Sequence, residues 1–567
     1  MRMRPNFTSL LAIATVAGMA STLTVAPDAN AATARMVPAS AASTTIVTAW
    51  PQDITTLDPA NLSTNEDHEL SKNIYQTLVE QKFAAQSDGE LQYVGTDLVP
   101  ELAQSWTLGP DSVTFHIRPN VRFYGTNDYV NADDVKFSLD RIWATPGVGD
   151  LQANGLQSPS DIHVVNNDTV TIDFETTEGK PTPVTPTLMA IFDQHFTGIV
   201  DEAAVAPHET KSDPTGANWL RSNAVGTGPY YVASHVPGIS IVLKANPDSW
   251  MPQPSYKTVE IRITTASVAS LMQSGTINFG EFGITNQQVN SLAKAGLSVY
   301  WQNIGFFDMF AITSAPADQV GPLANVDVRR AMADAMPYNT IVNDVLYGRG
   351  SRAYSIVSTS APGYTPAWNI YNTNISKAQA LMKAAGNPKV DVPLYYLSGD
   401  VDQTSIAILV QASLREIGVT TTLTPETQAG LFDVVDARST PAKGSKIGPP
   451  GVELFNWAAW TTDPKIVIGY WATSGGINNY SLWSSPEVNA INNEYSLQPT
   501  SPARTAAYKK AQVIIAAAAP DIPLAWVGTD TVVAKGITGV SFAPDRAALY
   551  FLLHPVGVSS PLDALFS

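Results

Sequence analysis

The 567-residue sequence contains no cysteine. This absence excludes a disulfide framework, a cysteine-based zinc or iron–sulfur site, and a lipid anchor attached to a cysteine. Positive charge is also sparse, because 33 Lys and Arg stand against 50 Asp and Glu, giving a formal net charge of −17. Such a chain has too little positive charge to displace phosphate counterions, so nucleic acid is not an expected partner.

Long apolar runs are missing as well. The stretch from Leu10 to Ala20 is too short to span a bilayer, which requires about 20 residues. It follows Arg2 and Arg4 and precedes an Ala-x-Ala pattern at 29–31, an arrangement typical of a cleaved secretory signal. We therefore expect a signal peptide over 1–31, a linker over 32–43, and a periplasmic or secreted protein with no lipid-modified cysteine.

Local catalytic motifs are also missing. The seven histidines form no H-x-H or H-E-x-x-H spacing, and the sequence has neither a G-x-S-x-G nucleophile elbow nor a P-loop. We therefore expect a binding protein rather than an enzyme, with no catalytic residues, no cofactor and no metal site. A secreted hydrolase that uses two dispersed carboxylates is an alternative, since such a pair leaves no local motif.

Hydrophobic residues make up 44% of the chain, enough for a sizeable core. Apolar residues recur at helical spacing in some segments and alternate with polar residues in others, which predicts a mixed α/β protein. Asn131 is expected to cap a helix, with acidic residues in its first turn. The expected helices are 70–80, 131–143, 326–346, 376–385, 404–417 and 503–519, and the expected strands include 44–50, 112–118, 241–244 and 394–397.

Seven short segments occur in order between residues 57 and 524 and resemble one protein family. They are LDP at 57–59 with NIYQTL at 73–78, PELA at 100–103 with FHIR at 115–118, NADDV at 131–135 with Ser138 and Arg141, GTGPY at 226–230 with NPDSW at 246–250, DVRRAM at 327–332, KA at 377–378 with AG at 385–386, and Tyr508 with APDIPL at 519–524. Together these segments resemble the extracytoplasmic solute-binding proteins of peptide/nickel-type ABC importers, the dipeptide- and oligopeptide-binding family.

The resemblance implies a two-lobed, periplasmic-binding-protein-like α/β fold of the large, peptide-binding type, with the ligand cleft between the lobes. By motif order, lobe one comprises 44–303 plus 529–567, and lobe two comprises 304–528. The implied function is to capture a small organic solute, peptide-like or other, and to deliver it to a membrane permease and ATPase complex. A monomer is expected, and a signalling receptor subunit with the same fold is an alternative.

One departure from the family bears on the ligand. In peptide-binding relatives, a W-x-x-D stretch shortly before a proline anchors the peptide's amino group, because a buried ammonium needs a paired carboxylate. The corresponding stretch here is WAAWTTDP at 457–464, which places Trp460 at the position of the acid. We hypothesise that a typical free-amine oligopeptide is not the preferred ligand. Asp463 belongs by this alignment to the turn before the proline.

Six residues are expected to bind the ligand. Trp457, Ala459 and Trp460 lie in the departing stretch, where two indoles could stack on a sugar ring, an aromatic group or a cation. The other three are Asp402 and Trp526, which fall where relatives line the cleft, and Arg438, a candidate partner for a ligand carboxylate. A nickel ion would have to arrive chelated, because no histidine pair or cysteine is available to hold it bare.

Overall fold

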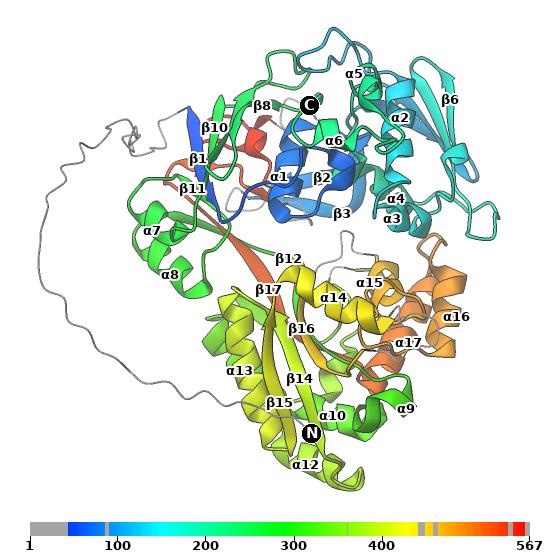
Figure 1. The fold of residues 1–567 in the computed structure, drawn as a ribbon, viewed down its shortest axis with the longest axis vertical. Helices are drawn as coiled ribbons and strands as arrows, with labels where there is room; N and C mark the ends of the chain where they lie inside the picture. The colour runs from blue at the N-terminus through cyan, green and yellow to red at the C-terminus, as the bar shows by residue number, and fades with distance from the viewer. Residues whose placement is uncertain are drawn as a thin grey trace, which may run out of the picture. The chain divides into compact units, whose positions relative to one another are not determined.

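The computed structural model describes residues 44–85, 90–359, 361–439, 448–457, 463–542 and 548–561. Helices and strands are mixed along these residues (Figure 1), so the expected α/β class is confirmed. The expected signal peptide and linker, residues 1–43, lie outside the described residues. None of the helices that the structure describes combines the length and the apolar character needed to cross a membrane.

The largest sheet of the described residues joins segments that are far apart in sequence. Its strand order is β11 (Phe279–Gly280), β17 (Asp521–Val533), β12 (Ser298–Ile312), β16 (Val452–Trp457), β14 (Val390–Leu397) and β15 (Val419–Glu426), with β13 (Gly350–Arg352) also paired to β17. Strands β14, β15 and β16 run parallel to one another, whereas β12 is antiparallel to both β16 and β17.

The remaining sheets are smaller and lie outside residues 304–528. Their strand orders are β1 (Thr45–Trp50), β10 (Thr258–Ile263), β9 (Ser240–Ala245), β8 (Tyr230–Val236); β4 (Ala103–Leu108), β5 (Ser112–Ile117), β7 (Thr169–Asp173), β6 (Ile162–Asn166); β19 (Ser541–Phe542), β3 (Leu91–Pro100), β2 (Val79–Ala85); and β18 (Ile537–Thr538), β20 (His554–Pro555). The strands expected at 44–50, 112–118, 241–244 and 394–397 are therefore present.

The structure also contains the following longer helices (Figure 1). They are α1 (Asn65–Ile74), α2 (Ala132–Ile142), α3 (Val148–Ala153), α7 (Val268–Gln273), α8 (Asn286–Lys294), α10 (Val326–Ala335), α12 (Ile375–Ala384), α13 (Val401–Arg415), α14 (Gln428–Ser439), α15 (Pro464–Trp471), α16 (Pro486–Tyr495) and α17 (Pro502–Ala518).

Helix α2 begins as its sequence predicts. The Asn131 side chain accepts hydrogen bonds from the backbone N–H groups of Asp133 and Asp134, and Asp134 Oδ2 accepts one from the Asn131 N–H at 2.9 Å. This reciprocal arrangement satisfies backbone donors that have no partner inside the helix.

Two of the expected helices have the wrong extent. Helix α1 begins earlier than residue 70, because Thr64 and Asp67 form a capping box, and it ends at Ile74 rather than at residue 80. Residues 79–85 form strand β2 instead. The helix expected over 326–346 stops at Ala335 as α10, and a short helix over 338–340 and a π-turn over 341–345 follow Pro337. A proline cannot continue the hydrogen-bond ladder of the preceding helix.

Several family-like motifs hold segments of the fold together. Asp58 and Arg141, from two different motifs, form a buried ion pair at 2.7 Å. Gly226 and Gly228 are required by close packing, because a Cβ at Gly228 would lie 2.5 Å from the carbonyl carbon of Ile74. Neither glycine has a positive φ. The backbone contact with α1, and not turn geometry, is therefore what demands glycine there.

The buried core divides along the chain. One hydrophobic cluster has all its buried members between Phe307 and Val527. The buried members of the other three clusters come from residues 46–300 and 532–553. This division supports our proposal that residues 304–528 form lobe two and that the chain on either side of them forms lobe one.

The buried acids predict how stability depends on pH. Burial raises the pKa of Glu69 and of Asp521 to about 8, and that of Asp134 to about 7. The folded state therefore keeps protons that the unfolded chain releases above about pH 4.5. We expect the free energy of unfolding to fall steadily as the pH rises from 5 to 8.

Urea denaturation at pH 5, 6.5 and 8 measures this dependence. A Glu69→Gln variant keeps an acceptor for the Tyr550 hydroxyl, which donates to Glu69, and should show a shallower slope. A stability that rises steadily from pH 5 to pH 8 would contradict the assignment of these acids as protonated in the folded protein.

Candidate functional site

Two of the expected ligand-binding residues lie beside the same aromatic ring. Trp457 ends strand β16 and Trp526 lies on β17, and both pair in register with Phe307 on the strand between them. The Phe307 ring centroid is 6.3 Å from that of Trp457 and 5.2 Å from that of Trp526, with edge-to-face geometry in both cases. Sequence reasoning placed both tryptophans near a cleft but missed Phe307, whose only signal is its place on the middle strand.

The two indoles differ in accessibility. Trp526 and Phe307 are buried, with 3% and 1% of their surface exposed, whereas Trp457 is half-buried. Trp457 also lies 5.6 Å from the ring of Trp471 and 6.5 Å from that of Tyr470. We call these five rings the aromatic row: Phe307, Trp457, Tyr470, Trp471 and Trp526. Within it, the partly exposed indole of Trp457 packs against buried rings, and such an indole can stack on a flat or apolar ligand group.

Asp402 occupies a different part of the molecule. It lies in the first turn of α13, and its Oδ2 accepts a hydrogen bond from Asn286 Nδ2 at 2.7 Å. Burial, with Asp400 and Asp530 nearby, raises the pKa of Asp402 to about 6. Asp530 itself pairs with Arg349, whose Nε donates to the two carboxylate oxygens at 2.9 and 3.1 Å. Asp402 therefore contributes a carboxyl group that takes up a proton in mildly acidic solution.

Arg438 is engaged inside the protein. It lies on α14, fully buried, and forms an ion pair with Glu453 on β16. Its Nη1 also donates to Thr313 Oγ1 at 2.9 Å, and its guanidinium lies 5.4 Å from the ring centroid of Tyr395. An internal carboxylate thus takes the place that we expected for a ligand carboxylate, and the role of Arg438 in ligand binding stays a prediction.

The stretch that carries the departure from the family is only partly described. Ala459 and Trp460 lie outside the described residues, so their roles stay predictions. Asp463 caps helix α15 and accepts two hydrogen bonds from Arg504 Nη2, at 2.8 and 2.9 Å. Its second oxygen also accepts from the Thr187 hydroxyl at 3.0 Å. These contacts agree with the structural role that the sequence suggested for Asp463.

Side chains from the two proposed lobes also contact each other directly. Tyr470 donates its hydroxyl hydrogen bond to Asp150 Oδ1 at 2.7 Å, and Lys465 Nζ donates to Asn154 Oδ1 at 2.9 Å. Lys465 is buried, and this burial lowers its pKa to about 8.

Both contacts, like those of Asn286 with Asp402 and Thr187 with Asp463, pair a residue outside 304–528 with one inside it. Sequence patterns gave no signal for these pairings, because the two partners of each pair lie far apart in the chain.

The family assignment rests on most of the chain. Residues 97–479 match the model of the bacterial extracellular solute-binding proteins, family 5. The chain belongs to this family. It is accordingly the substrate-binding component of an ABC importer, with the two-lobed fold of such proteins, and the expectation from the seven motifs is confirmed.

Relatives and solved structures cover nearly the full chain. The chain is 26% identical over 500 residues to the probable D,D-dipeptide-binding periplasmic protein DdpA of Escherichia coli, covering 87% of this chain and 90% of the relative. It is 25% identical to heme-binding protein A of Haemophilus influenzae, over 80% of this chain and 82% of the relative. Among solved structures, the Helicobacter pylori protein DppA in complex with the peptide STSA has a TM-score of 0.73 at 22% identity, covering 90% and 98% of the two chains.

The two tryptophans of the 457–460 stretch generate a prediction about affinity. Trp457→Ala and Trp460→Ala should each weaken ligand binding by about 1–3 kcal/mol, the usual loss when a stacked aromatic ring is removed. Calorimetric titration with the bound solute measures the effect. Trp219→Ala is the matched control, because Trp219 is also half-buried but stacks on His208, outside the proposed lobe two. Unchanged affinity in both test variants would remove these residues from the site.

Proposed function

We propose that this protein captures a small organic solute between its two lobes and delivers it to a membrane permease and ATPase complex. The observation that carries the proposal is the direct contact between side chains of the two proposed lobes. One of these side chains, Tyr470, has its ring 6.5 Å from the partly exposed indole of Trp457. Closure of two lobes around a solute is a standard way to present a loaded binding protein to a partner. We further propose that the protein is exported by its N-terminal signal, works as a monomer and performs no catalysis.

The proposed ligand differs from a simple free-amine oligopeptide. The support is the substitution of an indole, Trp460, for the acid that would pair with a peptide's ammonium, together with the engagement of Arg438 by Glu453. Solved structures with a similar fold are complexes with different ligands, namely a peptide, Fe(III)-EDTA and mannopinic acid. The fold therefore accommodates ligands other than peptides.

Two other functions make different predictions. A secreted hydrolase with dispersed carboxylates would turn its ligand over, whereas an importer component releases it unchanged. A signalling receptor subunit would bind without transport, and its gene would not lie beside genes for two permeases and two ATPases. Recovery of intact ligand after prolonged incubation tests the first alternative, and the gene neighbourhood tests the second.

A thermal-shift screen tests the proposed ligand class. The panel contains unmodified di- to pentapeptides, mono- and oligosaccharides, opine-like and polyamine compounds, and nickel with organic chelators. A ligand that binds only the folded state adds about 2.7 kcal/mol of stability at a hundredfold excess over its dissociation constant. We expect the largest shift from a compound outside the unmodified peptides. Tight binding of unmodified peptides would show that another group anchors the amine.

Closure predicts a second effect on affinity. Tyr470→Phe removes the hydroxyl that reaches Asp150, so the closed arrangement loses a hydrogen bond worth about 0.5–1.5 kcal/mol. Because ligand affinity scales with the fraction of closed protein, we expect the dissociation constant to rise by about threefold to tenfold. Tyr129→Phe, at an exposed tyrosine, is the control. Equal affinity of Tyr470→Phe and the wild type would mean that this contact does not contribute to closure.

A further inference from the structure

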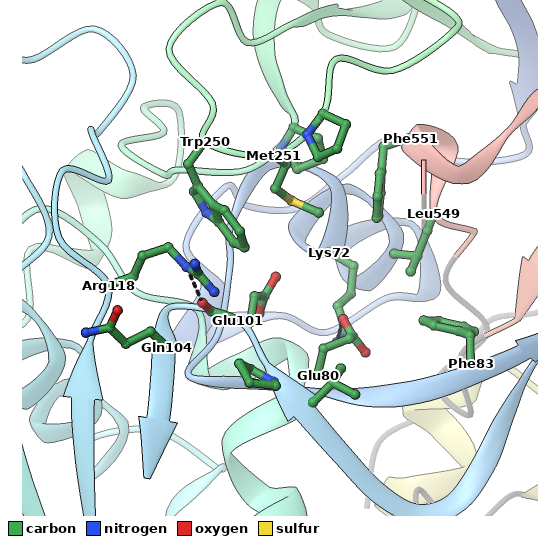
Figure 2. A pocket seen from close by; sticks show the side chains of 14 residues that line it. Lys72, Glu80, Phe83, Glu101, Gln104, Arg118, Trp250, Met251, Leu549 and Phe551 are labelled. Atoms are coloured by element: carbon green, nitrogen blue, oxygen red, sulfur yellow. Dashed lines mark hydrogen bonds and ion pairs between the residues drawn. The ribbon is translucent and has the colours of Figure 1, made fainter. Parts of the chain in front are cut away.

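A second pocket lies within the proposed lobe one. It has a volume of about 570 Å³, which is within the usual range of small-molecule sites (Figure 2). Its walls come from α1, β2, the end of β3, the start of β4, and the segments around residues 118, 250 and 550. Every residue that lines it falls outside 304–528, so the pocket shares no residue with the aromatic row. A ligand held here is therefore distinct from the solute of the cleft.

The side chain of Arg118 is fixed at two points on the pocket wall. Its Nε donates a hydrogen bond to the backbone carbonyl of Glu101 at 3.0 Å, and its guanidinium carbon lies 3.8 Å from the ring centroid of Trp250. Trp250 is itself anchored, because its Nε1 donates to Gln76 Oε1 at 3.0 Å. The stacked and bonded guanidinium is therefore preorganised, and it loses little further freedom when it binds a ligand.

The two Nη groups form the outer edge of the Arg118 guanidinium. Within the part of the chain that the structure describes, no oxygen accepts a hydrogen bond from either Nη, and no carboxylate lies within 4 Å of the guanidinium nitrogens. Arg118 lines the pocket, and Figure 2 shows its guanidinium directed into it. Two parallel N–H donors on one planar edge match the two oxygens of a carboxylate, which gives a bidentate, charge-assisted contact.

The acidic groups beside Arg118 are largely protonated below neutral pH. Burial raises the pKa of Glu101 to about 7, and burial together with Asp193 raises the pKa of Glu80 well above its usual value. Lys72 acts in the opposite direction on the pKa of both glutamates and forms an ion pair with Asp193 at 2.8 Å. In this charge cluster around Lys72, the two glutamates therefore present little negative charge to a ligand at pH 6.

The opposite wall of the pocket is apolar. Figure 2 shows Phe83, Leu549 and Phe551 across the pocket from Arg118. All three side chains are buried, with at most 8% of their surface exposed. An apolar wall that faces a few preorganised polar groups is the usual composition of a small-molecule site. The pocket therefore suits a ligand with an apolar body and one polar end that fits a guanidinium.

We propose that this pocket binds a small organic carboxylate with an apolar or aromatic body. The carboxylate accepts two hydrogen bonds from the Nη groups of Arg118, and the body packs against Phe83, Leu549 and Phe551. The sign of the ligand's charge follows from the open edge of the fixed guanidinium, because an ammonium is repelled by Arg118 and cannot accept its hydrogen bonds. The proposal does not depend on which solute occupies the cleft.

Protonation of Glu101 gives this binding a pH dependence. An ionised Glu101 repels a bound carboxylate and the protonated group does not, so binding takes up protons and becomes tighter as the pH falls from 8 to 6. The ligand stays ionised over this range, because a free carboxylic acid titrates near about pH 4. Arg118 also stays charged, although burial lowers its pKa. Lys72, Asp193 and Glu80 are the other titratable groups that face Glu101.

Calorimetric titration of the full mature protein with 3-phenylpropionate tests the proposal. Two compounds with a similar aromatic body are the matched ligand controls, the neutral 3-phenylpropanol and the cationic 3-phenylpropylamine. We expect the carboxylate to bind at least about tenfold more tightly than either control at pH 6, and this advantage to shrink at pH 8. No binding of the carboxylate, equal binding of the three compounds, tighter binding of the amine, or an advantage that grows from pH 6 to pH 8 would overturn the proposal.

Variants of Arg118 locate the site. Arg118→Gln removes the charge and should raise the dissociation constant for 3-phenylpropionate about tenfold or more. Arg118→Lys keeps the charge but lacks the planar pair of donors, so it should weaken binding less. Arg122→Gln is the matched control, because Arg122 is also half-buried but pairs with Asp248 at 3.6 Å and is not among the residues that line the pocket.

A third variant tests the pocket without touching its charges. Gln104→Trp places a large ring at the exposed rim and should obstruct entry. Thermal unfolding identifies any variant that fails to fold. Full affinity for 3-phenylpropionate in the folded test variants would overturn the assignment of the ligand to this pocket.

Discussion

The antiparallel pairing of β12 with β17 is the interaction on which the rest of the molecule depends. It joins Ser298 to Val533 at one end and Ala311 to Asp521 at the other, although the two strands are separated by more than two hundred residues of chain. The hydrophobic clusters at the two ends of this pair of strands do not share buried members. The pairing shifts register between Gln302 and Phe306, near the proposed lobe boundaries at 303/304 and 528/529. A register irregularity locally disrupts pairing, which makes it a suitable place for hinge motion.

The same ladder positions the candidate site. Phe307 lies just beyond the register shift, and its pairing with Trp457 and Trp526 brings together tryptophans that are far apart in sequence. Phe307 and Trp526 are buried, and Trp457 packs edge-to-face against the buried Phe307 ring. Tyr470 and Lys465, which contact Asp150 and Asn154, both lie on helix α15, and this helix begins seven residues after Trp457. The register shift and the ring of Phe307 in the aromatic row are therefore adjacent on β12.

Sequence reasoning was most effective where a local rule decides the structure. The cap at Asn131 and the strands with alternating polarity depend on neighbouring residues, and the ordered motifs identified the family. It failed at helix ends, because the capping box at Thr64 and the break at Pro337 outweigh apolar spacing. The partner of Arg438 and the charge cluster around Lys72 were also missed, since Glu453 and Asp193 meet them only through tertiary packing. Long-range pairs of this kind leave no periodic signal in one sequence.

Closure of the two lobes around a solute would make the molecule more compact. Small-angle X-ray scattering of the mature protein, with and without a saturating amount of the compound that gives the largest thermal shift, measures this change. We expect a smaller radius of gyration with the solute, and a smaller decrease in Tyr470→Phe, because closure is a population shift that the ligand and the Asp150 contact both favour. An identical radius of gyration with and without a tightly bound solute would contradict it.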